Sequence, residues 1–307
     1  MSIPISVVVC TRNRIESLTR CVQAFASVKT KHKWELIIVD NGSSDGTNEF
    51  LSALPTSLNN ATVVTTFELR MGSGAARNKG ASKAQGDIVA FTDDDCYVLE
   101  NYIDSMIAAF EAKPEIGFIA GRILLYDQSD LRSTINESED YLAFPPKAFI
   151  PGGAVQGANM AFRRSTFDRI GGFDINFGAG TSFPSEDIVA AAASIWAGIA
   201  GAYDPRPTVY HHHGRKTERE AKELWKSYDM ARGAYYAKFI LRKDTRTEYL
   251  SAWMRTTING IVKGRRTLER NAARGSAMDR FYAVRHFFIE VCGAVEYLTT
   301  RSRAHVG

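Results

Sequence analysis

The sequence predicts an α/β fold, in which a mostly parallel sheet is flanked by helices on both faces. Short apolar runs alternate with segments of helical periodicity four times in the first half of the chain, which is typical of parallel strands joined by helices. Several of these runs also end at polar or acidic residues, where such sheets bind ligands. The chain of 307 residues, with 45% hydrophobic and 23% charged residues, has a globular composition that excludes disorder, collagen and a coiled coil.

The first half contains four predicted strands and four predicted helices. Each strand is an apolar run bounded by polar residues, and each helix has apolar residues three or four positions apart. The predicted strands cover residues 5–11, 34–40, 61–67 and 87–92. The predicted helices cover residues 16–28, 47–54, 74–84 and 101–112, the last ending before a proline.

The second half is less regular. A polar loop is expected over residues 128–150, because the segment contains two adjacent prolines. The elements expected after it are strands over 154–162 and near 208–212, helices over 186–196 and 216–241, and two or three amphipathic helices over 245–303.

Charge and cysteine content restrict the class of protein. The net charge of +4 is too small to indicate nucleic-acid binding. The four cysteines form neither a CxxC pair nor a zinc pattern, as expected in a reducing compartment. The N-terminus has no signal-peptide pattern, and no uncharged apolar stretch reaches 18 residues. We therefore expect a cytoplasmic protein, whose membrane contact, if it has any, is peripheral and at the inner face.

The C-terminal part is basic and amphipathic. Apolar residues recur near helical spacing at Phe281, Val284 and Phe288, and the segment 263–266 reads Lys-Gly-Arg-Arg. Two interpretations remain open. The helix packs on the rest of the protein or on a second copy in a homodimer, or it lies on an anionic membrane surface near a lipid-linked acceptor.

Three adjacent carboxylates follow the fourth predicted strand, at Asp93, Asp94 and Asp95. Asp93 and Asp95 lie on the same side of an extended chain and can address one ligand. Hard carboxylate ligands suit Mg²⁺ or Mn²⁺ bridged to phosphates, whereas an acidic triplet alone would equally suit a solvated loop. Thr11 and Asp40 end two other strands, so we expect all of these groups at one edge of the sheet.

Three further segments contain candidate residues. Glu186 and Asp187 follow Ser185 at a predicted helix start, where Ser185 is expected as N-cap and acidic residues are favoured by the helix dipole. The triplet 211–213 consists of histidines, which can complete a metal site or lie in a surface loop. Gly157 precedes the predicted strand residue Asn159 and allows close approach of the backbone.

Taken together, the motifs resemble the family 2 inverting glycosyltransferases of the GT-A fold. The resemblance covers residues 3–213 and depends on the order of the segments VVVCTR (7–12), IVDNGSSDGT (38–47), GAARN (74–78), FTDDD (91–95), GGFD (171–174) and ED (186–187). It implies a catalytic domain over residues 1–214, with a nucleotide-sugar half at about 1–126 and an acceptor and base half at about 127–214. Residues 215–307 would form a helical extension.

The resemblance also implies roles for the donor side. Thr11 and Arg12 would line the nucleotide pocket, and Asp40 would accept a hydrogen bond from the nucleobase. Arg77 would approach the diphosphate or the donor sugar. Asp93 would contact ribose or sugar hydroxyls.

The remaining roles concern the metal, the base and the acceptor, and each is implied by the resemblance. Asp95, with His211 or His213, would bind Mn²⁺ or Mg²⁺, and Asp94 occupies the variable place in the motif. Asp187 would be the general base, with Glu186 as the alternative. The backbone around Gly157 and Asn159 would border the donor sugar and the acceptor.

The predicted function is metal-dependent transfer, with inversion, of a sugar from a nucleoside diphosphate to an acceptor hydroxyl in surface-glycan synthesis. UDP or dTDP donors are favoured and GDP remains open; the acceptor would be a saccharide or a lipid-linked saccharide. A nucleotidyltransferase is the first alternative, although residues 11–14 (TRNR) lack the glycine-rich loop it would need. A non-catalytic partner subunit of the same fold is the second.

Overall fold

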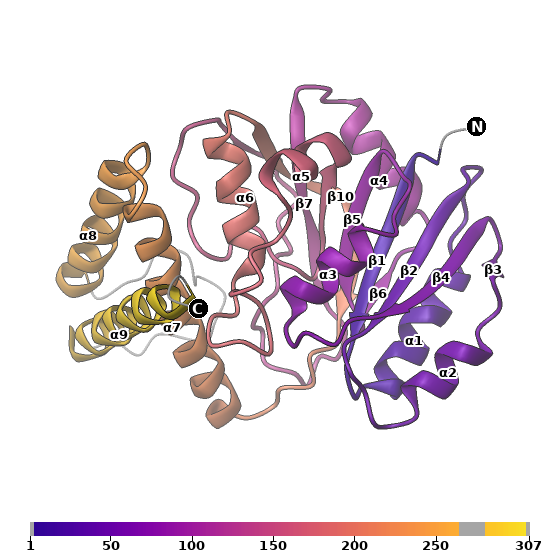
Figure 1. Ribbon diagram of the computed structural model, residues 1–307, viewed down its shortest axis with the longest axis horizontal. Coiled ribbons are helices and arrows are strands. Elements are labelled where there is room, and N and C mark those ends of the chain that lie inside the picture. The colour runs from indigo at the N-terminus through magenta and orange to yellow at the C-terminus, as the bar shows by residue number, and fades with distance from the viewer. Residues whose placement is uncertain (1–2, 264–279, 305–307) are drawn as a thin grey trace.

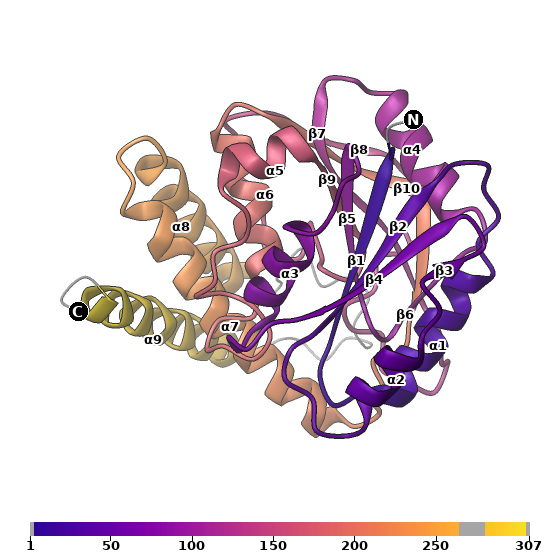
Figure 2. The same cartoon turned by 45° about the vertical axis from the view of Figure 1, so that its right-hand side comes forward.

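The computed structural model describes residues 3–263 and 280–304. Ten strands form one mixed sheet with helices on both faces (Figures 1 and 2). The strand order is β3-β4-β2-β1-β5-β9-β7-β10-β6, and β8 pairs with β10. The strands are β1 (Ile5–Thr11), β2 (Trp34–Asp40), β3 (Ser57–Leu58), β4 (Ala61–Phe67), β5 (Ile88–Asp93), β6 (Cys96–Val98), β7 (Ile116–Leu125), β8 (Leu142–Phe144), β9 (Met160–Arg163) and β10 (Ala200–His211).

Helices join most of these strands. They are α1 (Ile15–Ala26), α2 (Thr47–Ala53), α3 (Ser73–Ala81), α4 (Tyr102–Glu111), α5 (Arg164–Ile170), α6 (Glu186–Trp196), α7 (Glu218–Ile240), α8 (Arg246–Lys263) and α9 (Arg280–Ala304). Figures 1 and 2 show α7, α8 and α9 side by side at the end of the molecule that lies farthest from β3 and β4.

The central strands run parallel, and their alternating side chains build two cores. β1 pairs in parallel with both β2 and β5, and β10 pairs in parallel with β7. Val7 and Val9 belong to the core that includes the buried residues of α1 and α4, whereas Val8 belongs to the core that includes residues of α3 and α6. This alternation follows from the two-residue period of a strand, and it explains why the central strands are apolar throughout.

The prediction of an α/β fold with a mostly parallel sheet is confirmed. The first-half strands and helices occur within a few residues of the predicted bounds. β7 was not predicted, although it is a long and mostly buried strand. The predicted strand over 154–162 was wrong in its first half, because the chain turns near Gly157 and pairs with β5 and β7 only from Met160. The predicted loop over 128–150 contains the short strand β8.

The C-terminal helices pack into the same core as α3 and α6. Tyr235 of α7 and Tyr249 of α8 are fully buried there, and their hydroxyl oxygens lie 2.9 Å apart. α7 begins at a capping box, in which Thr217 accepts a hydrogen bond from the Glu220 backbone and the Glu220 side chain accepts one in return. Among the described residues, no helix is long and apolar enough to cross a membrane.

Candidate active site

A cleft of about 1300 Å³ lies at the carboxyl edge of the parallel strands. β1, β5 and β10 end there at Thr11, Asp93 and His211, and α6 begins there at Glu186. Parallel strands bring these ends together although they are far apart in sequence. Residues 148–157 and residues of α7 and α8 also line the cleft. The cleft thus contains the candidate residues Thr11, Arg12, Arg77, Asp93, Asp94, Asp95, Gly157, Glu186, Asp187 and His211.

The three adjacent carboxylates have different surroundings. Asp94 is buried and accepts a hydrogen bond from the Thr11 hydroxyl at 2.7 Å. Burial raises the pKa of Asp94 to about 7, against the lowering effect of Arg14. Asp95 is also buried, whereas the Asp93 side chain is 35% exposed. The triplet is therefore part of the cleft wall and not a solvated loop.

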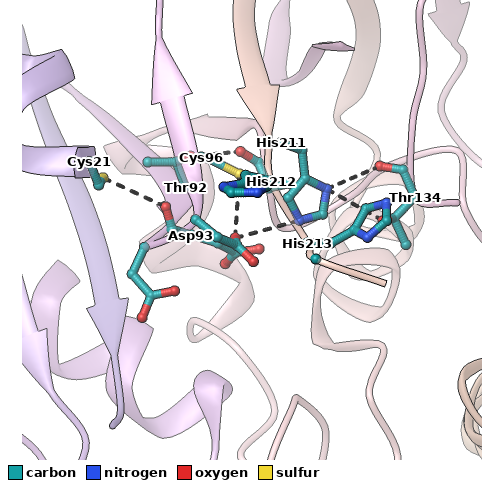
Figure 3. A network of polar contacts seen from close by, with 12 residues as sticks. Cys21, Thr92, Asp93, Cys96, Thr134, His211, His212 and His213 are labelled. Atoms are coloured by element: carbon teal, nitrogen blue, oxygen red, sulfur yellow. Dashed lines mark hydrogen bonds and ion pairs between the residues drawn. The ribbon is translucent and has the colours of Figure 1, made fainter. Parts of the chain in front are cut away.

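The side chains of Asp93, Asp95, Cys96 and His211 place four candidate ligand atoms within 4.8 Å of one another. Figure 3 shows Asp93, Cys96 and His211 of this group. Nε2 of His211 lies 3.5 Å from Oδ1 of Asp95. Burial raises the pKa of the Cys96 thiol far above its usual value, and sulfur is a soft ligand that does not suit a hard cation. The two carboxylates and the imidazole remain as donors, and this oxygen-rich set fits Mn²⁺ or Mg²⁺.

His211 is oriented by contacts on both sides of its ring. Its Nδ1 atom lies 3.4 Å from the carbonyl oxygen of Thr134 (Figure 3). The Nε2 atom on the other side of the ring is directed at Asp95. A carbonyl contact at one nitrogen fixes the tautomer in which the other nitrogen can bind a metal. Burial disfavours the protonated ring, but the hydrogen bond and charge of Asp95 outweigh it and raise the pKa of His211. Burial alone would raise the pKa of Asp95, but the hydrogen bonds and charges of His211 and Arg14 outweigh it and lower the pKa.

The other two histidines of the triplet face elsewhere. His213 accepts a backbone hydrogen bond from Arg215 at Nδ1, and its Nε2 lies 2.8 Å from the carbonyl oxygen of Leu131. Both ring nitrogens of His213 are thus used within the protein, and this ring does not line the cleft. The Nδ1 atom of His212 lies 3.3 Å from the Tyr97 hydroxyl. The geometry therefore favours His211 over His213 as a metal ligand.

Arg77 connects the acidic triplet to the start of α6. The guanidinium group is 4% exposed, and it pairs with Asp93 at 2.7 Å and with Glu186. Glu186 also accepts a hydrogen bond from the Ser73 hydroxyl at 2.5 Å. A Cβ atom at Gly157 would lie 2.4 Å from Nη2 of Arg77, so only glycine leaves room for this arginine. The close approach expected at Gly157 is therefore made to Arg77.

Asp187 is held by backbone groups and is only half-buried. Its Oδ2 atom accepts a hydrogen bond from the Gly157 backbone at 2.8 Å, and its Oδ1 atom accepts one from Ile188 at 2.7 Å. Desolvation, followed by the negative charge of Glu186, raises the pKa of Asp187 to about 7. A carboxyl group with this pKa can accept a proton near neutral pH. The expected side-chain cap by Ser185 does not form, since its hydroxyl has no hydrogen-bond partner among the described residues.

Two predicted site residues lie behind the cleft wall. Asp40 is buried and accepts a hydrogen bond from the Ser43 backbone at 2.9 Å, and it does not line the cleft. Asn159 is fully buried and donates hydrogen bonds to the carbonyl groups of Arg122 and Pro207, so its side chain supports the sheet. The structure therefore gives Asn159 no contact with the cleft, and it leaves Asp40 at the end of β2 beside the cleft residue Asn41.

Sequence reasoning missed several cleft residues. Arg14 pairs with Asp94 and Asp95, and it could have been considered because it follows the first strand by three positions. Ser73 contacts Glu186 and begins α3. The cleft residues of α7 and α8, such as Tyr228 and Arg255, have no motif that could have indicated them.

Comparisons with known proteins agree with this geometry. The family model of glycosyl transferase family 2 matches residues 6–171. Glycosyltransferase AglE of Haloferax volcanii is 36% identical over 101 residues, which are 33% of this chain and 33% of that protein. The alignments with the first curated relatives span about a third to a half of the lengths of those proteins.

Solved structures show the same fold. The mannosyltransferase PcManGT from Pyrobaculum calidifontis, in complex with GDP-Man and Mn²⁺, has a TM-score of 0.60 and 16% identity, covering 99% of this chain and 80% of that one. S. aureus TarS 1-349 in complex with UDP-GlcNAc has a TM-score of 0.58 and 15% identity, covering 97% and 92%. These structures support the GT-A fold, and the family match covers more than half of the chain. The protein belongs to glycosyl transferase family 2.

Proposed function

We propose that the protein is a metal-dependent inverting glycosyltransferase that transfers a sugar from a nucleoside diphosphate to an acceptor hydroxyl. One observation carries the proposal: a carboxylate and imidazole set suited to a divalent cation shares a cleft with Asp187, whose pKa lies near neutrality. Family membership supports it, and so does the fold shared with PcManGT, which was solved in complex with GDP-Man and Mn²⁺.

The site residues divide the work of the reaction. Asp93, Asp95 and His211 would hold Mn²⁺ or Mg²⁺, which stabilises the negative charge of the departing diphosphate. Thr11, Arg12 and Asn41 line the part of the cleft where the nucleotide would lie, and Asp40 supports the end of β2 beneath it. Uracil, thymine and guanine all remain open as the base of the donor.

Asp187 would act as the general base. It would take the proton from the acceptor hydroxyl while that oxygen attacks the anomeric carbon, and a positioned base contributes about 10²- to 10⁴-fold. Glu186 is the weaker candidate, because its carboxylate is held by Arg77 and Ser73. One base suits a single displacement with inversion, whereas retention through a covalent intermediate would need a second, nucleophilic carboxylate, by analogy with retaining glycosidases.

The acceptor and the division of the chain are part of the same proposal. Residues 1–214 would form the catalytic unit and residues 215–307 a helical extension that completes the acceptor side of the cleft. The acceptor would be a saccharide, free or lipid-linked, in surface-glycan synthesis. Neither alternative function gains support: residues 11–14 contain no glycine-rich loop, and Arg77, Asp93, Asp95 and Asp187 all line one cleft.

A donor screen tests the proposal. The protein would be incubated with Mn²⁺ or Mg²⁺ and UDP-, dTDP- and GDP-sugars, and released nucleoside diphosphate would be measured with and without chelator. We expect slow, chelator-sensitive release from one donor and its loss in Asp95→Ala. Nucleotide binding without turnover on any donor and acceptor tested would favour the non-catalytic subunit, and pyrophosphate release from a nucleoside triphosphate would favour the nucleotidyltransferase.

A further inference from the structure

Arg14 is bound to the same carboxylates that would hold the metal. Its Nη2 atom lies 2.8 Å from Oδ2 of Asp95, and its Nη1 atom lies 3.0 Å from Oδ1 of Asp94. This is a fork-like contact of one guanidinium with two neighbouring carboxylates. The other oxygen of Asp95 faces His211, so Arg14 and the candidate metal ligands share one carboxyl group.

Two arginines contact the acidic triplet, and they differ in their freedom. Arg77 is 4% exposed and is fixed between Asp93 and Glu186. The Arg14 side chain is 42% exposed, and its ion pairs with described residues are both made to the triplet. Arg14 can therefore turn toward solvent or a bound anion by side-chain rotation, whereas Arg77 cannot leave without breaking a buried network.

The backbone around Arg14 is fixed independently of its side chain. The Asn13 backbone donates a hydrogen bond to Ser43 at 2.9 Å, and the Asn13 side chain accepts one from the Ser44 backbone at 2.7 Å. The Ile15 backbone donates a hydrogen bond to Asp45 at 3.1 Å. A change of partner by Arg14 would thus leave the loop between β1 and α1 in place.

We propose that Arg14 is an exchangeable counter-ion that makes metal binding depend on the nucleotide. Without metal, its guanidinium neutralises Asp94 and Asp95. A divalent cation at Asp95 would repel this guanidinium across a few ångströms of buried cleft, so the two positive charges compete for the carboxylate. The donor diphosphate gives the released guanidinium a new anionic partner in the same cleft. Metal and nucleotide binding are then positively coupled, and the coupling is reciprocal.

The inference rests on the proposed function, and its test measures Mn²⁺ binding rather than turnover. Free Mn²⁺ would be titrated by electron paramagnetic resonance with and without UDP or GDP. Without nucleotide, we expect Arg14→Gln to bind Mn²⁺ about ten-fold more tightly than the unchanged protein does. Adding nucleotide should then raise the Mn²⁺ affinity of the variant less than that of the unchanged protein, by a similar factor. Arg14→Lys keeps the charge but loses the fork, so its affinity should lie between the two.

Arg12→Gln is the matched control for the titration without nucleotide, because Arg12 is exposed and lines the same cleft, and its replacement removes the same charge. An equal gain in Mn²⁺ affinity in both variants would reduce the effect to overall charge and overturn the inference. A weaker affinity in Arg14→Gln would overturn it as well. If the unchanged protein binds no Mn²⁺ with or without nucleotide, the metal-dependent function fails together with the inference.

Thermal unfolding gives a second readout. Metal-free Arg14→Gln should unfold at a lower temperature than the unchanged protein, because the buried Asp94 loses its ion pair and the buried Asp95 retains only His211. Mn²⁺ should raise the unfolding temperature more in the variant than in the unchanged protein. If Mn²⁺ raises the unfolding temperature of both proteins equally, the exchange of Arg14 for the metal is contradicted. Arg14→Lys replaces Arg14→Gln in this measurement if the glutamine variant does not fold.

Discussion

At the scale of single residues, Asp187 and Glu186 are neighbours with separate environments. Asp187 is bonded to two backbone N–H groups and is half-buried, whereas Glu186 is buried and bonded to Arg77 and Ser73. The charged groups that act on Asp187 are Glu186, which raises its pKa, and Arg77, which lowers it. Substitutions at Asp187 and at Glu186 should therefore have different effects on transfer.

The pH dependence of transfer should follow Asp187. Its pKa is about 7, and only the ionised form accepts a proton, so we expect the rate to fall about ten-fold per pH unit below that value. Asp187→Asn should retain donor binding and lose about 10²- to 10⁴-fold in transfer. Glu186→Gln should retain transfer and shift the acidic limb to lower pH, because a neighbouring negative charge is removed. Transfer by Asp187→Asn at the original rate would reject the assignment of the base.

The same shift has a consequence for stability. The pKa of Asp187 in the folded state lies above its value in an unfolded chain, so the folded state favours the protonated form. This contribution to the free energy of unfolding is complete below about pH 4 and is lost as the pH rises through about 7. Asp187→Asn should therefore flatten the dependence of the unfolding temperature on pH in this range.

Gly157 should tolerate no larger residue. A Cβ atom there would lie 2.4 Å from Nη2 of Arg77, which Asp93 and Glu186 hold in place. Gly157→Ala should displace Arg77 and the bond to Asp187, and so reduce turnover more than overall stability. Gly152→Ala is the matched control, because it lines the same cleft and a Cβ there meets nothing within 4 Å. Equal turnover of the two variants would contradict this role of Gly157.

At the scale of elements, the sequence predicted the strands that have a strong local pattern. β1, β2 and β4 were predicted with their observed bounds, because each is an apolar run bounded by polar residues. β7 was missed although its residues are mostly apolar, because Gly117, Gly121 and Arg122 interrupt the apolar run and glycine is depleted in strands. The start of β9 was placed too early, because a buried loop around Gln156 and Gly157 resembles a strand in composition.

The candidate site was predictable where a residue belongs to a motif. Asp93, Asp95, Arg77 and Asp187 lie in the cleft as expected. The choice between His211 and His213 needed the structure, because it depends on which ring nitrogens already have partners. The contribution of α7 and α8 to the cleft depends on packing between distant segments, which a single sequence does not reveal.

The crossing of α7 and α9 gives a prediction at this scale. A Cβ atom at Gly233 would lie 1.8 Å from the carbonyl oxygen of Glu290, and one at Gly293 would lie 2.0 Å from that of Met230. Replacing glycine by alanine within a helix normally stabilises it by about 1 kcal/mol. For Gly293→Ala we expect the opposite: the free energy of unfolding should fall by about 1–3 kcal/mol, because α7 and α9 must move apart to admit the methyl group. Urea unfolding measures the difference, and unchanged or increased stability would contradict the close crossing.

At the scale of the whole molecule, α8 lines the cleft, and both α8 and α9 carry exposed apolar side chains. One side of α8 contributes Ala252 and Thr256 to the cleft, whereas Met254 and Ile258 are more than half exposed. On α9, Phe288 is 62% exposed and Val295 is 54% exposed. Arg265 and Arg266 of the basic segment, and the side chains of Lys263 and Phe281, lie outside the described residues.

In the membrane interpretation drawn from the sequence, the exposed apolar side chains would contact an anionic membrane and bring a lipid-linked acceptor to the mouth of the cleft. Vesicle sedimentation would test it, and we expect binding to phosphatidylglycerol vesicles that weakens with salt, and little binding to phosphatidylcholine vesicles. Phe288→Ser combined with Met254→Ser should reduce vesicle binding and leave donor hydrolysis unchanged, because neither residue lines the cleft. Light scattering measures the oligomeric state and so tests the competing interpretation, in which a second copy covers these residues. If the unchanged protein is a dimer that binds no vesicles, and the double variant is a monomer, the exposed side chains belong to a dimer interface. A monomer that binds anionic vesicles would instead place the reaction at the membrane surface, since α8 carries exposed apolar side chains and also lines the cleft.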